Sequence, residues 1–108
     1  MTDKYNKLVR DNIPQIIRHQ GYTPIIRSLD SDEYFEALNQ KLSEELAEYL
    51  DNYHIEELAD IIEVVYAIVR HKGLSIDEFE NIRGKKLYER GGFNDKLYLV
   101  EVERKATV

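Results

Sequence analysis

Two short acidic repeats hold the residues best suited to chemistry. The first reads Glu-Glu-Leu-Ala-Glu over residues 44–48, and the second reads Glu-Glu-Leu-Ala-Asp over residues 56–60. The interval between Lys41 and Arg70 contains no lysine or arginine, although the whole chain has 15 such residues beside 21 acidic ones. We therefore expect no basic partner for these carboxylates within reach along their own segment.

Helical spacing gathers four of these carboxylates into one cluster. Residues three apart on a helix share a face, so Glu45 projects with Glu48. Glu57 projects with Asp60 for the same reason. If the chain turns near residues 52–53, antiparallel helices bring Glu48 beside Glu57. The same pairing brings Glu45 beside Asp60, so the spacing predicts an acidic seam between two helices.

A divalent metal ion would relieve the repulsion within such a cluster. Like charges that lie close together and partly shielded from water raise one another's pKa unless a cation neutralises them. The chain has no cysteine and no paired histidine near the repeats, so oxygen ligands favour Mg²⁺, with Mn²⁺ as a substitute. Glu44 and Glu56 point further away on the helical wheel and are candidates for the outer shell.

A charged, solvent-exposed helix face is the alternative explanation of the two repeats. Acidic residues at helical spacing most often decorate such a face. Two features argue against it here. The repeats lack lysine and arginine neighbours, and Glu45 and Glu57 fall on the border of, or within, the apolar stripes of their helices.

Candidates for phosphate binding lie toward both ends of the chain. A magnesium ion held by carboxylates usually takes further ligands from substrate phosphates, which also need basic groups from the protein. The candidates are Lys7, Arg10, Arg83, Lys86 and Arg90. The last three recur at helical spacing and could form one basic stripe. The alternative is an ordinary outer face on which they pair with Glu78, Glu80 and Glu89.

Four helices are expected to position these groups. They are predicted over about 11–19, from the caps at 30–32 to about 51–52, over about 55–72, and from the Ser75 cap to the glycines at 91–92. Asp11 is the expected cap of the first helix, and Pro14 lies in its first turn. Gly73 is expected to stop the third helix.

Two further segments are predicted to be extended. Residues 97–102 are rich in leucine, valine and tyrosine, and residues 23–28 combine β-branched residues with a proline that suits an edge strand. We expect these segments to pair as a small β-hairpin. The predicted fold class is therefore mainly α, an antiparallel bundle of about four helices with this hairpin.

Composition indicates a folded globular protein. Its 108 residues suffice for a single domain over 1–108. No apolar stretch approaches the roughly 20 residues that span a bilayer, and the polar start lacks a secretory signal core. The absence of cysteine suits the cytoplasm, which is the expected location. The net charge of −6 argues against nucleic-acid binding, which needs a basic face.

The motifs together resemble those of the MazG-like, all-α nucleoside triphosphate pyrophosphohydrolases, which include phosphoribosyl-ATP pyrophosphohydrolases. The likeness rests first on the acidic repeats at 44–48 and 56–60. It extends to Tyr-Asn-Lys-Leu-Val-Arg-Asp-Asn-Ile-Pro at 5–14 and to Lys-Lys-Leu-Tyr-Glu-Arg-Gly-Gly-Phe at 85–93. These flanking motifs look like one compact subgroup of that superfamily, and together the motifs cover most of the chain.

The resemblance implies hydrolysis of a nucleoside triphosphate between its α and β phosphates, with one or two magnesium ions. The products would be a nucleoside monophosphate and pyrophosphate, and one role would be the removal of noncanonical nucleotides. The implied catalytic metal ligands are Glu45, Glu48, Glu57 and Asp60, with Glu44 and Glu56 as outer-shell or second-metal candidates. The implied phosphate contacts are Lys7, Arg10, Lys86 and Arg90. Because family members of this size pair their chains, a homodimer or a dimer of dimers is also implied.

Two other functions stay open at the level of the sequence. One is hydrolysis of phosphoribosyl-ATP, which is the same chemistry with a different leaving half. The other is a non-catalytic helical module that binds a nucleotide or a protein partner. Turnover separates the second from the first, and a comparison of substrates separates phosphoribosyl-ATP from simple triphosphates.

Overall fold

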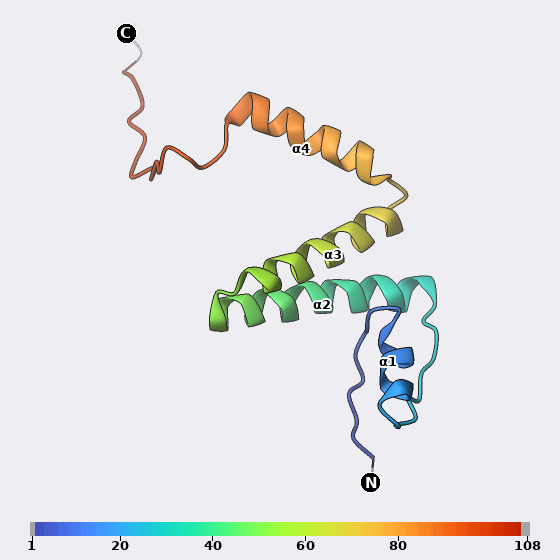
Figure 1. Ribbon diagram of the computed structural model, residues 1–108. Coiled ribbons are helices and arrows are strands. Elements are labelled where there is room, and N and C mark those ends of the chain that lie inside the picture. The colour runs from blue at the N-terminus through green and yellow to red at the C-terminus, as the bar shows by residue number, and fades with distance from the viewer. Residues whose placement is uncertain (1, 107–108) are drawn as a thin grey trace. The chain divides into compact units, whose positions relative to one another are not determined.

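Four helices make up the regular structure of the chain. The structure, a computed structural model, describes residues 2–106 (Figure 1). The helices are α1 (Ile13–His19), α2 (Ser31–Asn52), α3 (Ile55–His71) and α4 (Ile76–Arg90). The mainly-α class is therefore confirmed. Over the same described range, no helix is both long and apolar enough to cross a membrane.

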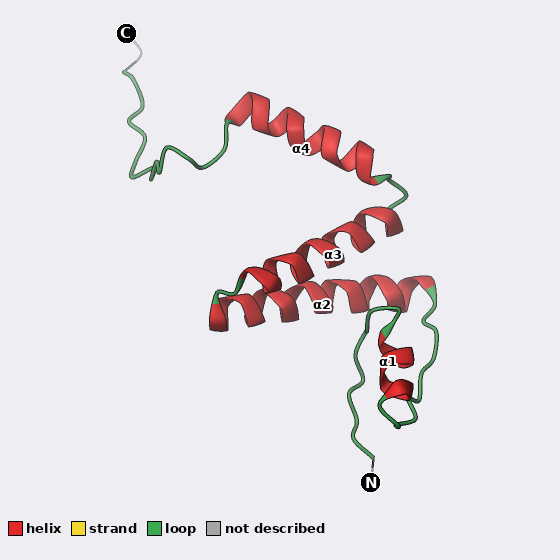
Figure 2. Ribbon diagram, in the orientation of Figure 1, coloured by secondary structure: helices red, strands yellow, loops and turns green. Residues whose placement is uncertain are grey.

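The predicted β-hairpin is wrong. Within residues 2–106 no strand is formed, and segments 23–28 and 97–102 are both irregular (Figure 2). An isolated pair of strands is marginally stable in water unless a further layer packs on it. The apolar side chains of these segments have no such layer, since Ile25 is 91% exposed and Leu97 is 88% exposed.

The α2–α3 pair is the packed element that carries the acidic repeats. The chain divides into two compact units, Met1–Ile76 and Asp77–Val108, and the first contains α1, α2 and α3. Within it α2 and α3 contact each other as an antiparallel hairpin (Figure 1). Leu38 on α2 is buried, as are Val64 and Val69 on α3. The predicted helical hairpin is thus present.

The start of α2 is fixed by a reciprocal cap. The Asp30 side chain accepts a hydrogen bond from the Glu33 backbone N–H at 2.8 Å, and the Glu33 carboxylate accepts from the Asp30 backbone N–H at 3.5 Å. Arg27 donates to the same Glu33 carboxylate at 3.0 Å. Because the first backbone N–H groups of a helix have no partner within the helix, the bond to Asp30 gives the Glu33 N–H a partner, and the reciprocal pair sets where α2 begins.

We expect Asp30→Ala to lower the free energy of unfolding by about 1 kcal/mol, the usual effect of losing an N-cap. Urea denaturation followed by circular dichroism would measure it. Asp32→Ala is the matched control, because Asp32 lies in the first turn of α2 but is not the capping residue. Equal losses in the two variants would contradict a specific role for the cap.

The first helix begins differently from its prediction. Its N-cap is Asn12, whose backbone is already helical (φ −87°, ψ −7°) and whose side chain makes no capping bond. Because the N-cap position is Asn12, the prediction of Asp11 as cap is wrong. A capping side chain usually folds back from a non-helical backbone, which Asn12 lacks, so α1 begins without a side-chain cap. Pro14 does lie in the first turn. The predicted stop of α3 also holds, since Gly73 follows it at φ +88°.

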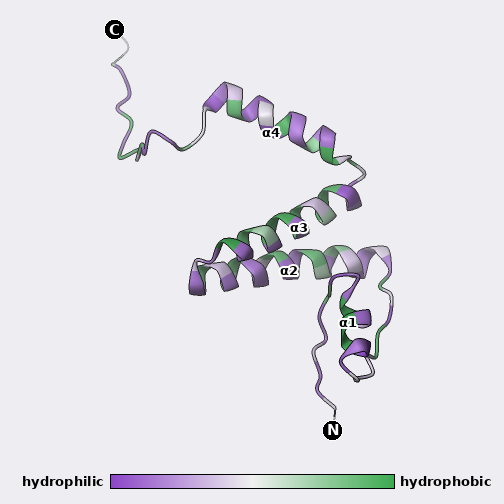
Figure 3. Ribbon diagram, viewed as in Figure 1, coloured by the Kyte–Doolittle hydropathy of each residue, from purple (hydrophilic) through white to green (hydrophobic). Residues whose placement is uncertain are grey.

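An apolar face of the α2–α3 hairpin lies open to solvent. Hydrophobic residues recur along both helices (Figure 3). Those that remain exposed are Leu46 (49%), Leu50 (55%), Ile55 (72%), Leu58 (37%) and Ile62 (47%). Their spacing of three or four residues places them on one side of each helix. This set is called the open apolar face below.

Candidate metal centre

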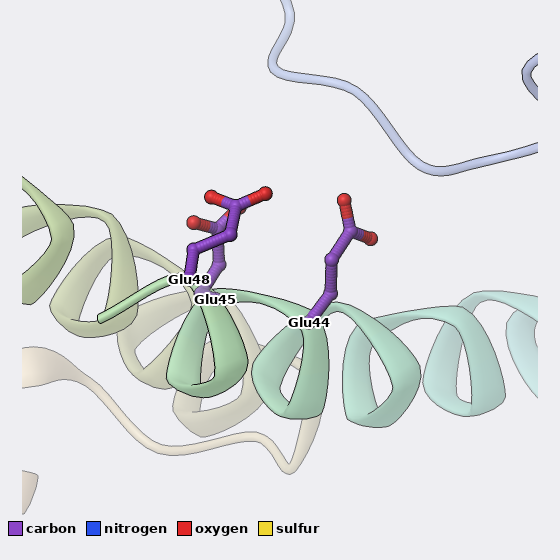
Figure 4. Close-up of side chains that lie close together, drawn as sticks. All are labelled: Glu44, Glu45 and Glu48. Atoms are coloured by element: carbon purple, nitrogen blue, oxygen red, sulfur yellow. The ribbon is translucent and has the colours of Figure 1, made fainter. Parts of the chain in front are cut away.

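The α2–α3 hairpin brings the predicted carboxylates together in two overlapping groups. The first group is Glu44, Glu45 and Glu48, and the second is Glu45, Glu57 and Asp60. In each group one carboxylate oxygen per residue lies within 4.8 Å of the others. Figure 4 shows the three side chains of the first group projecting from one side of α2. We call these the α2 group and the interhelical group.

Glu45 belongs to both groups and is the most buried of these residues. It is 7% exposed, which is rare for a carboxylate without full pairing. Among the described residues, Glu45 Oε2 and Glu57 Oε2 are buried and have no hydrogen-bond partner. A buried acceptor without a partner is costly to fold, and a bound cation would offset that cost.

Each carboxylate of the interhelical group has one oxygen that contacts a protein donor. Lys41 Nζ lies 3.3 Å from Glu45 Oε1, and Asn52 Nδ2 donates to Glu57 Oε1 at 3.3 Å. Arg10 Nη2 lies 2.7 Å from Asp60 Oδ1. Such contacts orient a carboxylate and leave its second oxygen for a metal. The donor set, three carboxylates with oxygen ligands only, suits Mg²⁺ or Mn²⁺.

Glu48 lies at the exposed edge of the cluster, and carboxylates of both α2 and α3 affect its pKa. Its pKa is raised above the ordinary value, first by the negative charge of Glu45, then by partial desolvation, and further by Glu57. The influence of Glu57 across the seam agrees with the predicted neighbours on α2 and α3. The repulsion that the sequence predicted is therefore present, and a divalent cation would relieve it.

We expect Glu48→Gln to stabilise the metal-free protein increasingly as the pH rises. A raised pKa in the folded state gives a contribution that is present at low pH and is lost as the pH rises through that pKa, because ionisation is harder in the folded state. Glutamine never ionises and escapes this loss. Melting temperatures of both proteins in a chelator, from acidic to neutral pH, would measure it. Glu36→Gln, an exposed change on α2, is the control, and a difference that is independent of pH would contradict the prediction.

Two of the predicted basic residues reach the cluster from the segment before α1. Lys7 Nζ lies 4.0 Å from Glu44 Oε1, and Arg10 bonds Asp60 as described. The N-terminal segment therefore contacts acidic residues of both α2 and α3. Both side chains are about half exposed, which leaves them accessible to a ligand. Their role as phosphate contacts stays a prediction.

Lys41 is the residue that the sequence analysis missed. Its ammonium contacts Glu44 Oε1 at 3.4 Å and Glu45 Oε1 at 3.3 Å, and its side chain is only 16% exposed. The expectation that the carboxylates have no basic partner is therefore wrong. The signal was present, because a lysine three and four residues before two glutamates shares their helix face.

The two outer-shell candidates have different surroundings. Glu44 was expected to point away, but it lies within the α2 group. Its contacts with Lys7 and Lys41 draw its side chain toward the cluster. Glu56 is exposed and belongs to neither group.

The basic residues of α4 lie in the second compact unit. Arg83 Nε donates to Glu80 Oε2 at 2.8 Å, which agrees with the alternative of an ordinary paired face. Lys86 and Arg90 are exposed. The role of these three residues as phosphate contacts stays a prediction.

Comparison with known proteins finds a relative over part of the chain. An uncharacterized protein of Mycolicibacterium smegmatis is 60% identical to the chain over 42 residues, which is 39% of this chain and 43% of that protein. The aligned part thus spans less than half of the relative. No family model and no solved structure matches the chain.

Proposed function

We propose that the chain is a magnesium-dependent nucleotide pyrophosphohydrolase of the MazG-like type. It would hydrolyse a nucleoside triphosphate between the α and β phosphates and release a nucleoside monophosphate and pyrophosphate. The observation that carries the proposal is the pair of buried, unpartnered oxygens, Glu45 Oε2 and Glu57 Oε2, on facing helices. The resemblance of the acidic repeats to that superfamily supplies the reaction.

The metal would be held by Glu45, Glu57 and Asp60, with Glu48 at the solvent edge. When bound, magnesium supplies a water of lowered pKa and neutralises charge on the leaving pyrophosphate. Glu48 is the proposed proton acceptor for that water, because it lies beside Glu45 at the exposed edge of the cluster. Lys7 and Arg10 would turn from carboxylates to substrate phosphates, to which both are accessible.

An assembly of two or more copies would complete this enzyme. The open apolar face lies on the same two helices as the acidic seam, and burying it would remove several large side chains from water. A homodimer or a dimer of dimers is proposed on this basis. Sedimentation equilibrium would distinguish it from a monomer of 12.8 kDa.

The test of the reaction is pyrophosphate release with and without magnesium. The panel should contain canonical and modified nucleoside triphosphates and phosphoribosyl-ATP, with Glu48→Gln assayed beside the natural protein. Release that needs magnesium and is lost in the variant supports the proposed site. Preference for phosphoribosyl-ATP would assign the alternative substrate. Binding of magnesium and nucleotide without any release would favour a non-catalytic module.

A further inference from the structure

Lys41 places a positive charge among the carboxylates of the α2 group, at the position that a metal ion bound by this group would take. Its ammonium contacts one oxygen of Glu44 and one of Glu45, two of the three members of the α2 group. The side chain is largely buried, so the charge is fixed in the cluster rather than free in solvent. All of these groups lie on one helix within two turns, which makes the arrangement independent of how α3 packs.

The interhelical group differs from the α2 group in what it offers a metal. Glu45 uses Oε1 for Lys41 and keeps Oε2 buried without a partner. Glu57 likewise uses Oε1 for Asn52 and keeps Oε2 without one. The interhelical group therefore contains both unpartnered oxygens, whereas the α2 group contains one of them, on the shared Glu45, and already has a cation in contact with it.

The charges of the cluster also favour a single divalent ion. The carboxylates of the cluster are Glu44, Glu45, Glu48, Glu57 and Asp60, and the basic groups that contact them are Lys7, Arg10 and Lys41. Five negative charges against three positive ones leave two, which is the charge of one divalent ion. A second divalent ion would leave the cluster with two excess positive charges for as long as all three basic groups stay in contact with it.

We infer that Lys41 is a built-in cation that fills the α2 group and limits the centre to one tightly bound divalent ion, held by Glu45, Glu57 and Asp60. The inference rests on the metal site of the proposed function and adds its metal number and the residue that sets it. Lys41 is a positioning residue here, since it acts on the carboxylates and not on the substrate. Removing its charge opens the α2 group to a second ion.

The test is the number of Mn²⁺ ions bound by the full chain, measured by calorimetry and by electron paramagnetic resonance without substrate. We expect one tight ion in the natural protein and two in Lys41→Met. The second ion of the variant should bind at least about tenfold more tightly than any second ion of the natural protein, because a neighbouring positive charge is gone. Lys41→Arg keeps the charge and should still bind one.

Lys85→Met is the matched control, because Lys85 faces Glu89 at the same i,i+4 spacing outside the cluster. It should bind one ion. Lys41→Met with Glu44→Gln should return to one ion, since the α2 group is then incomplete. If Lys41→Met does not fold, Glu44→Gln alone still tests the inference, because it must keep the tight ion.

Each other outcome overturns the inference. Two tight ions in the natural protein, one ion in folded Lys41→Met, or loss of the tight ion in Glu44→Gln would each contradict it and leave the proposed function standing. Binding of Mn²⁺ by none of the proteins would overturn the metal centre itself. Helical circular dichroism establishes which variants are folded.

Discussion

Glutamine in place of Glu57 is expected to lower kcat/KM for pyrophosphate release by at least about 100-fold, more than the usual effect of removing a group that only orients a ligand. Glu57 Oε2 is buried and unpartnered, and the amide has no charge to offer a metal there. The same change removes a negative charge from the cluster, so the metal-free protein should melt at an equal or higher temperature. Activity assays and thermal melts in a chelator would show the two effects together.

Glu56→Gln is the matched control for this prediction. It is the same chemical change one residue away, on an exposed side chain that belongs to neither carboxylate group. Its kcat/KM should stay within about twofold, since surface substitutions usually change free energies by about 0.5 kcal/mol or less. Equal losses in the two variants, or full activity in Glu57→Gln, would show that the interhelical group is not the metal centre.

Leu38→Ala is expected to have the largest effect on stability, lowering the free energy of unfolding by about 2–5 kcal/mol. Leu38 is 2% exposed and is the most completely buried side chain of the described chain. Truncation removes its transfer free energy and leaves a cavity in a small core. Because the free energy of unfolding of a native protein is about 5–15 kcal/mol in total, this loss is a large share of it. Urea unfolding of the metal-free protein would measure it.

The control for this second prediction is Leu97→Ala, the same truncation at a side chain that is 88% exposed. We expect a change of about 0.5 kcal/mol or less there. A loss at Leu38 no greater than at Leu97 would mean that the hairpin core contributes little to folding.

The helices could be predicted from the sequence because their signals are local. Asp30, one of the caps predicted at 30–32, caps α2 together with Glu33, which lies three residues further on. Gly73 takes the positive φ that ends α3. The acidic seam followed from the same periodicity once the turn was placed near Tyr53. Geometry that depends on spacing within one helix, or across one short turn, can be predicted from the sequence.

The features that could not be predicted depend mostly on contacts between distant parts of the chain. Strand propensity at 97–102 could not show whether a partner strand would be available, and the predicted hairpin is absent from residues 2–106. The bond from Arg10 to Asp60 joins residues 50 apart, which no periodicity indicates. The contacts of Lys41 with Glu44 and Glu45 do follow a local rule, but Lys41 lies just outside the interval that contains no basic residues.

The turn between α2 and α3 bears on the proposed metal centre although it holds none of the carboxylates of that centre. Tyr53 lies there at φ +58°, a left-handed conformation that costs a non-glycine residue about 1–2 kcal/mol. Its backbone N–H donates to the Tyr49 carbonyl at 2.7 Å, and the two rings meet edge to face at 5.8 Å. These contacts tie the turn to α2 and keep the connection short. In the proposed metal centre the hairpin would be a preorganised chelator, because the short turn holds the carboxylates of α3 at a high effective concentration beside those of α2. A longer, looser connection would then weaken ion binding without altering a single ligand.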